Sequence, residues 1–110
     1  MKLILRIILD QADANQAHAV SCLIIEKLSK SCRDIQQEFL RPYWKIEGTY
    51  ELLLTSNLHD QEEFKQFRTN VFPENAKEYA SEYIWDKDKD PNENFLLIPE
   101  VKWAHLEAVS

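Results

Sequence analysis

Glycine is almost missing from this chain of 110 residues, which contains only Gly48. Phosphate-binding loops and dinucleotide-binding turns need several glycines at fixed spacing, because their backbones pass close to the phosphates. The sequence therefore excludes both kinds of nucleotide site. Cysteine is scarce too: Cys22 and Cys32 lack the dense spacing of a secreted disulfide scaffold, which favours reduced thiols in a cytoplasmic protein.

Long apolar runs are also missing, since no stretch approaches the roughly 18 apolar residues of a membrane span. The opening segment Lys2–Leu9 imitates a signal peptide, but Arg6 interrupts its apolar run and Asp10 follows at once. We interpret this segment as a core strand and expect no membrane partner. Residues 1–110 are expected to form a single domain, because compact domains cluster at roughly 100 to 150 residues.

The apolar periodicity of the first half predicts a strand, a helix and a hairpin. Lys2–Leu9 predicts a strand that is central in its sheet and buried largely on both faces. Asp13 and Gln16 are spaced as a capping box and open an amphipathic helix over residues 15–32. The β-type residues around Gly48 predict a hairpin, in which this glycine supplies the positive φ of the turn.

In the second half, a capping box at Asp60 opens another helix, which Pro73 interrupts and which then continues on one face through Ile84. The segments 95–98 and 101–109 predict closing strands. The order of elements predicts an α+β fold, a mainly antiparallel sheet with helices on one face. The expected arrangement is a ferredoxin-like βαββαβ order whose second helix is broken at Pro73.

Negative charge is concentrated in one part of the chain. The formal net charge is -6, and residues 60–100 contain 11 acidic and 5 basic residues, whereas residues 1–59 are balanced. An acidic field attracts basic proteins and repels nucleic acid, so we expect a basic protein partner and no nucleic-acid binding. The region is either a docking surface or a solvated face. As a docking surface it would consist of an exposed aromatic anchor, Trp85, and the carboxylates of Glu78, Glu82, Asp86, Asp88 and Asp90.

The three aspartates of this set imitate the start of an EF-hand calcium loop. Asp86, Asp88 and Asp90 occupy its first three oxygen positions. Pro91 stands where the loop needs glycine, and Leu97 stands where it needs a bidentate glutamate. We therefore expect no calcium site of this type.

His18 and Cys22 lie four residues apart on the first predicted helix, a spacing that suits two metal ligands or a thiol with its base. No second pair of ligands accompanies them, and we interpret Cys22 as a small core residue. A hydrolase based on Cys22 would require a reactive thiol. Because the sequence offers no oxyanion site and no clear nucleophile, we predict that the protein is not an enzyme and has no catalytic residues, no metal site and no cofactor.

The acidic run from Glu74 to Glu93, the opening strand and the hairpin over Trp44–Leu54 together resemble, as a whole-chain architecture, small bacterial immunity proteins. These are the proteins that neutralise toxins of contact-dependent growth inhibition and other polymorphic toxin systems. The resemblance implies a non-catalytic, cytoplasmic inhibitor that binds a cognate toxin domain, often a basic nuclease, and we expect a monomer rather than a homodimer.

The alternative is a small acidic cytosolic chaperone or adaptor for a secreted effector, which would bind an unfolded segment as a homodimer. Its distinguishing feature would be an exposed apolar strand edge or groove. The apolar run Phe95–Ile98 is the candidate for that edge.

Overall fold

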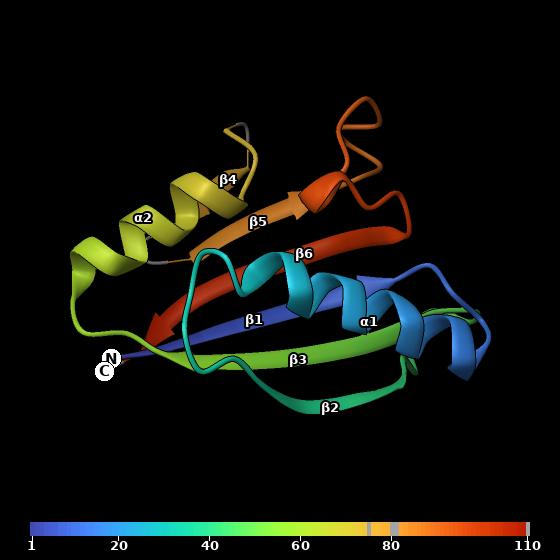
Figure 1. Ribbon diagram of the computed structural model, residues 1–110. Coiled ribbons are helices and arrows are strands. Elements are labelled where there is room, and N and C mark those ends of the chain that lie inside the picture. Colours follow the sequence, from blue (N-terminus) through green and yellow to red (C-terminus); the bar gives the residue numbers. More distant parts are fainter. Residues whose placement is uncertain (75, 80–81, 110) are drawn as a thin grey trace.

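The computed structural model describes residues 1–74, 76–79 and 82–109, which form two helices and a six-stranded antiparallel sheet (Figure 1). In chain order the elements are β1 (Lys2–Leu9), α1 (Ala14–Leu28), β2 (Gln36–Pro42), β3 (Tyr50–Asn57), α2 (Gln61–Val71), β4 (Lys77–Tyr79), β5 (Glu82–Asp86), the 3-10 turn η1 (Phe95–Leu97) and β6 (Val101–Val109). The strands lie in the order β2-β3-β1-β6-β5-β4. The predicted α+β class is confirmed, and β1, α1, β2, β3, α2 and β6 follow the predicted βαββαβ order.

The core lies between the sheet and the two helices, which cover the same face of it (Figure 1). Alternate residues of a strand point to opposite faces. The helix-facing residues of β1 are nearly inaccessible to solvent: Leu3, Leu5, Ile7 and Leu9. On the other face of β1, Ile8 is buried but Lys2 and Arg6 are exposed, so the expectation that the strand is buried largely on both faces is wrong at these two residues. We call this other side the helix-free face. The strand is central as predicted.

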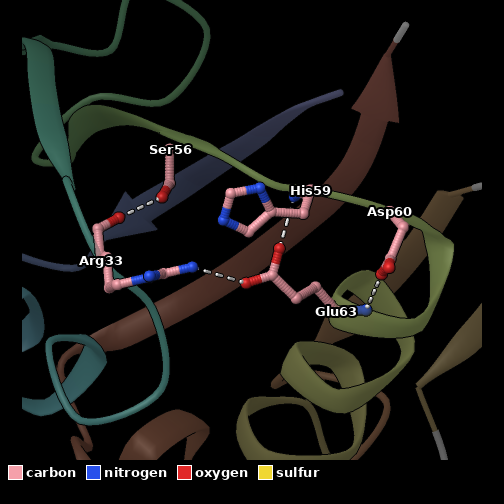
Figure 2. A network of polar contacts seen from close by, with 5 residues as sticks. All are labelled: Arg33, Ser56, His59, Asp60 and Glu63. Atoms are coloured by element: carbon pink, nitrogen blue, oxygen red, sulfur yellow. Dashed lines mark hydrogen bonds and ion pairs between the residues drawn. The ribbon is translucent and has the colours of Figure 1, made fainter.

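Figure 2 shows why α2 begins where the capping box predicts. The Asp60 carboxylate accepts a hydrogen bond from the Glu63 backbone N–H at 3.0 Å. The Glu63 carboxylate in turn accepts one from the His59 backbone N–H and pairs with the Arg33 guanidinium at 3.4 Å. These contacts satisfy amides at the helix start that have no partner within the helix. The hydrogen bond from His59 is the main reason why the pKa of Glu63 is lowered.

The hairpin of β2 and β3 is also confirmed, with Gly48 at a φ of 77° in the connection between the two strands. Pro42 is the last residue of β2, which is an edge strand and therefore needs no hydrogen bond from every amide. The connection, residues 43–49, is long enough to form a surface of its own at one end of the sheet.

The segment after Pro73 departs from the prediction. The expected continuation of the helix is wrong, because β4 and β5 form a hairpin there and β5 pairs with β6. In β5, Trp85 and Tyr83 pair with helix-facing residues of β6, whereas Ile84 and Asp86 point to the helix-free face. This segment forms a hairpin rather than a helix because β5 pairs with β6, which extends the sheet by two strands at this edge.

The segment 95–98 is a 3-10 turn rather than the predicted closing strand. Leu96 and Leu97 have φ values of 52° and 60°, which no strand accommodates. Phe95 and Ile98 are buried, whereas Leu97 is 82% exposed. The predicted strand over 101–109 is confirmed as β6.

Candidate binding surface

A row of ion pairs crosses the helix-free face from β2 to β1. The Glu51 carboxylate of β3 lies 3.3 Å from the Arg6 Nε of β1 and 3.2 Å from the Arg41 Nε of β2. The Glu51 side chain is only 6% exposed, whereas the two arginines are about half exposed. The Arg41 guanidinium also stands over the Phe39 ring, 3.8 Å from its centre. This half of the face is therefore held in one arrangement by its own contacts.

The other half of the face is built on β5 and β6. The Trp103 ring stacks on the His105 ring, with 5.8 Å between the ring centres and 10° between the planes. The His105 Nε2 lies 2.9 Å from a carboxylate oxygen of Glu82, which belongs to β5. Neighbouring positions of two paired strands thus bring an indole, an imidazole and a carboxylate together.

Trp103 lines two hollows near the start of β6. This strand begins at the end of the sheet that is remote from the chain termini (Figure 1). The smaller, which we call the Trp103 hollow, has a volume of about 230 Å³ and lies between the connection 43–49 and the loop 87–94. Its lining includes Ile8, Tyr43, Ile46 and Lys102. The larger, of about 370 Å³, lies on the β4 side of Trp103. Pockets for small molecules usually span about 300 to 1,000 Å³, so the Trp103 hollow suits a single side chain better.

The connection 43–49, which lines the Trp103 hollow through Tyr43 and Ile46, also carries the most exposed tryptophan described. Trp44 lies between the lining residues Tyr43 and Ile46 in the chain and is 81% exposed. Its ring contacts only the Lys45 ammonium among the charged groups described, at 5.2 Å. Ile46 is 40% exposed. A large aromatic side chain left in solvent beside a recess is typical of a protein interaction site.

Two predicted site residues have other surroundings in the structure: Trp85 is buried, and Glu78 contacts Tyr83 of the neighbouring strand. Trp85 was predicted to be an exposed anchor, but it is 2% exposed and packs against Phe95 in the core, with ring centres 6.0 Å apart. The cause is the alternation of β5, which points Trp85 toward the helices. Glu78 pairs with Tyr83 across β4 and β5, and it accepts a hydrogen bond from the Tyr83 hydroxyl at 3.3 Å. Burial, and then the charge of Glu78, raise the pKa of Tyr83.

Three of the four remaining predicted carboxylates gather near Trp103, whereas Glu82 contacts His105 instead. Asp86 lines both hollows, Asp88 lines the Trp103 hollow and Asp90 lines the larger one. The Asp86 carboxylate accepts a hydrogen bond from the Asp88 backbone N–H at 2.9 Å, which fixes the start of the loop. Lysines stand among them, and the Lys102 ammonium lies 3.8 Å from the Asp88 carboxylate. The surface is therefore a mixed pattern of charges rather than a purely acidic one.

Sequence reasoning missed the aromatic part of this surface. The signal for Trp103 and His105 was present, because alternate residues of the predicted strand 101–109 must share a face. Nothing in the sequence places the connection 43–49 beside Asp86, since only the sheet pairing brings Tyr43 and Ile46 to the end of β5.

The two cysteines lie elsewhere in the molecule. The Cys22 sulfur is 3.6 Å from the His18 Nε2, as the helical spacing requires, but Cys22 is exposed, so its assignment to the core is wrong. The buried stripe of α1 runs through Ala17 and Ile24 instead. Cys32 is half-buried, and burial raises the pKa of its thiol. Neither thiol lines the hollows beside Trp103.

Comparisons of this chain with protein-family models, with curated proteins and with solved structures found no match. The geometry of the surface therefore has to support any functional conclusion. None of the helices described is long and apolar enough to cross a membrane.

Proposed function

We propose that this protein is a non-catalytic inhibitor of the immunity-protein kind, which binds and neutralises a cognate toxin domain in the bacterial cytoplasm. The observation that supports the proposal best is the exposed Trp44 in the connection 43–49, which lines the Trp103 hollow together with the charged side chains of Asp86, Asp88 and Lys102. Such a combination of an aromatic anchor, a recess and a polar rim is what tight protein interfaces use.

In this proposal the two parts of the surface have different tasks. Trp44 enters an apolar recess of the partner, which removes most of its exposed ring from water. A basic side chain of the partner enters the Trp103 hollow and pairs with Asp86 and Asp88, displacing the 3.8 Å contact of Lys102. The net charge of -6 accelerates the encounter with a basic partner before either contact forms.

The fold keeps this surface ready for binding. The carboxylate of Asp86 is held by its contact to the Asp88 amide, and β5 and β6 are paired along all of β5. Glu51, buried between two arginines, holds the neighbouring half of the face. A surface that is already ordered loses little conformational entropy on binding, which favours high affinity.

No specific observation favours the chaperone or adaptor. Its expected apolar edge at 95–98 is a 3-10 turn in which Phe95 and Ile98 are buried. The inhibitor is therefore the candidate that we carry forward.

The test is capture of partners from a lysate of the source cells on the immobilised protein, at low and then high salt, with mass spectrometry of the bound proteins. The proposal expects one basic protein, bound stoichiometrically and weakened by salt. Trp44→Ala is expected to lower the affinity for that protein at least about a hundredfold, as the loss of a central aromatic anchor does.

Leu97→Ala is the matched control, because Leu97 is as exposed as Trp44, at 82% against 81%, but belongs to η1 rather than to the connection that lines the Trp103 hollow. It is expected to leave the affinity unchanged. Equal affinities for the wild type and Trp44→Ala would contradict the proposed surface. A stable homodimer without any partner would instead favour the chaperone.

A further inference from the structure

Three potential metal ligands meet on the helix-free face, and none of them lines the Trp103 hollow, although His105 stacks on Trp103. The side chains of Glu82, His105 and Glu107 each offer one ligand atom, and these atoms all lie within 4.8 Å of one another. All three residues are half-buried. Glu82 comes from β5, whereas His105 and Glu107 are alternate residues of β6 and therefore share a face.

The register of the two strands places like charges opposite each other. Glu82 and Glu107 are direct cross-strand partners, and such a pair of carboxylates destabilises a sheet unless a positive charge lies between them. Within the described part of the chain, the side chain of Glu107 has no hydrogen bond and no ion pair. On its other side, Glu107 pairs in register with Ile4 of β1, which offers no charge.

The nearest arginine is engaged elsewhere. Arg6 of β1 pairs in register with His105, but its guanidinium Nε is 3.3 Å from the Glu51 carboxylate. Of the two glutamates, only Glu82 contacts the imidazole of His105, whose Nε2 is 2.9 Å from its carboxylate. The carboxylates of Glu82 and Glu107 therefore face each other across the two strands without a lysine or arginine of the described residues paired to either of them.

The imidazole is also oriented as a ligand. Trp103 stacks on the His105 ring at 10°, which fixes the plane of the ring, and the Nε2 points toward the carboxylates. A ligand whose rotamer is locked by packing loses little freedom when the ion binds.

We propose that Glu82, His105 and Glu107 bind a divalent transition-metal ion of the Zn²⁺ type. One imidazole and two carboxylates suit Zn²⁺, whereas Mg²⁺ and Ca²⁺ prefer oxygen ligands alone. Ligand atoms about 2.1 Å from a tetrahedral ion are roughly 3.4 Å apart, so the flexible glutamates need to move by only an ångström or so. Three protein ligands leave a coordination position open for water or for a ligand atom of another molecule.

The test is isothermal titration of the isolated, metal-free protein with ZnCl₂ and with MgCl₂, which requires no toxin partner and is thus independent of the proposed inhibition. We expect one Zn²⁺ per chain and no heat from Mg²⁺. Glu107→Gln removes a ligand while keeping the shape of the side chain, and it is expected to lower the Zn²⁺ affinity at least about tenfold. The melting temperature should rise with Zn²⁺ in the wild type and not in this variant.

Two control variants exclude other zinc-binding groups. His59→Asn removes an exposed imidazole outside the cluster, and Cys22→Ser removes the thiol beside His18. Both should bind Zn²⁺ as the wild type does. The proposal is overturned if the wild type does not bind Zn²⁺, or if Cys22→Ser abolishes binding while Glu107→Gln preserves it.

Discussion

The two faces of the sheet in this protein differ in composition and in solvent exposure. The face under the helices is apolar at nearly every position, and its side chains are almost inaccessible to solvent. The helix-free face combines arginines, glutamates, a histidine and aromatic rings, and several of its polar groups contact one another rather than water. The comparison indicates that the first face stabilises the fold, while the second is available for recognition.

The largest expected effect comes from a pair of neighbouring leucines in β3 that point to opposite faces of the sheet. Leu52 faces the helices and is fully buried, whereas Leu53 points to the helix-free face and is half-buried. Leu52→Ala is expected to lower the free energy of unfolding by about 2 to 5 kcal/mol, because it leaves a cavity in the core. Leu53→Ala should cost about 1 kcal/mol, since its site can fill with water.

Urea denaturation of the two variants checks this prediction. Similar losses of unfolding free energy in both variants would mean that the helix-free face stabilises the fold as much as the face under the helices does.

The second prediction concerns the buried carboxylate of the helix-free face. Glu51→Ala leaves Arg6 and Arg41 side by side without their shared partner. We expect a loss of about 1 to 2 kcal/mol of unfolding free energy, because solvent screens the two half-exposed arginines and reduces the usual worth of charged hydrogen bonds.

Glu47→Ala, in the exposed connection between β2 and β3, is the matched control and should change the stability by less than about 0.5 kcal/mol. If the two variants were equally stable in chemical denaturation, the row of ion pairs would not hold this half of the face.

A smaller effect is expected at the start of α2, which belongs to neither face. Because the folded state lowers the pKa of Glu63 below its value of 4.5 in the unfolded chain, the ionised group stabilises the fold above about pH 4.5. This stabilisation is lost as the pH falls through the lowered pKa. In Glu63→Gln, stability should therefore depend less steeply on pH in the acid range than in the wild type.

Thermal melts between neutral and acid pH measure this slope. Glu62→Gln removes a charge from the same helical turn and should retain the slope of the wild type. A wild-type slope in Glu63→Gln as well would show that the contact with the His59 amide does not couple to folding.

Features set by local chemistry were predictable from the sequence. The caps at Asp13 and Asp60, the turn at Gly48 and the strand at 2–9 each depend on residues close together in the chain. The hairpin of β4 and β5 was not, because the spacing of its aromatic residues also fits a helix, and only pairing with β6 resolves the ambiguity.

The candidate surface was predictable only in part, for the same reason. Asp86, Asp88 and Asp90 are close in sequence and do lie around Trp103. The burial of Trp85 depends on strand register, which a single sequence does not specify at this edge of the sheet, and the exposure of Trp44 depends on the conformation of the connection 43–49.

The central claim is that the exposed end of the helix-free face inhibits a toxin, and growth of a bacterial host tests it most directly. The captured partner is expressed from an inducible gene, alone and together with the wild-type protein, Trp44→Ala or Leu97→Ala. We predict that the partner alone stops growth, that the wild type and Leu97→Ala restore it, and that Trp44→Ala fails to do so although it folds. Growth that is unaffected by the partner, or rescue by Trp44→Ala equal to that by the wild type, would contradict the account.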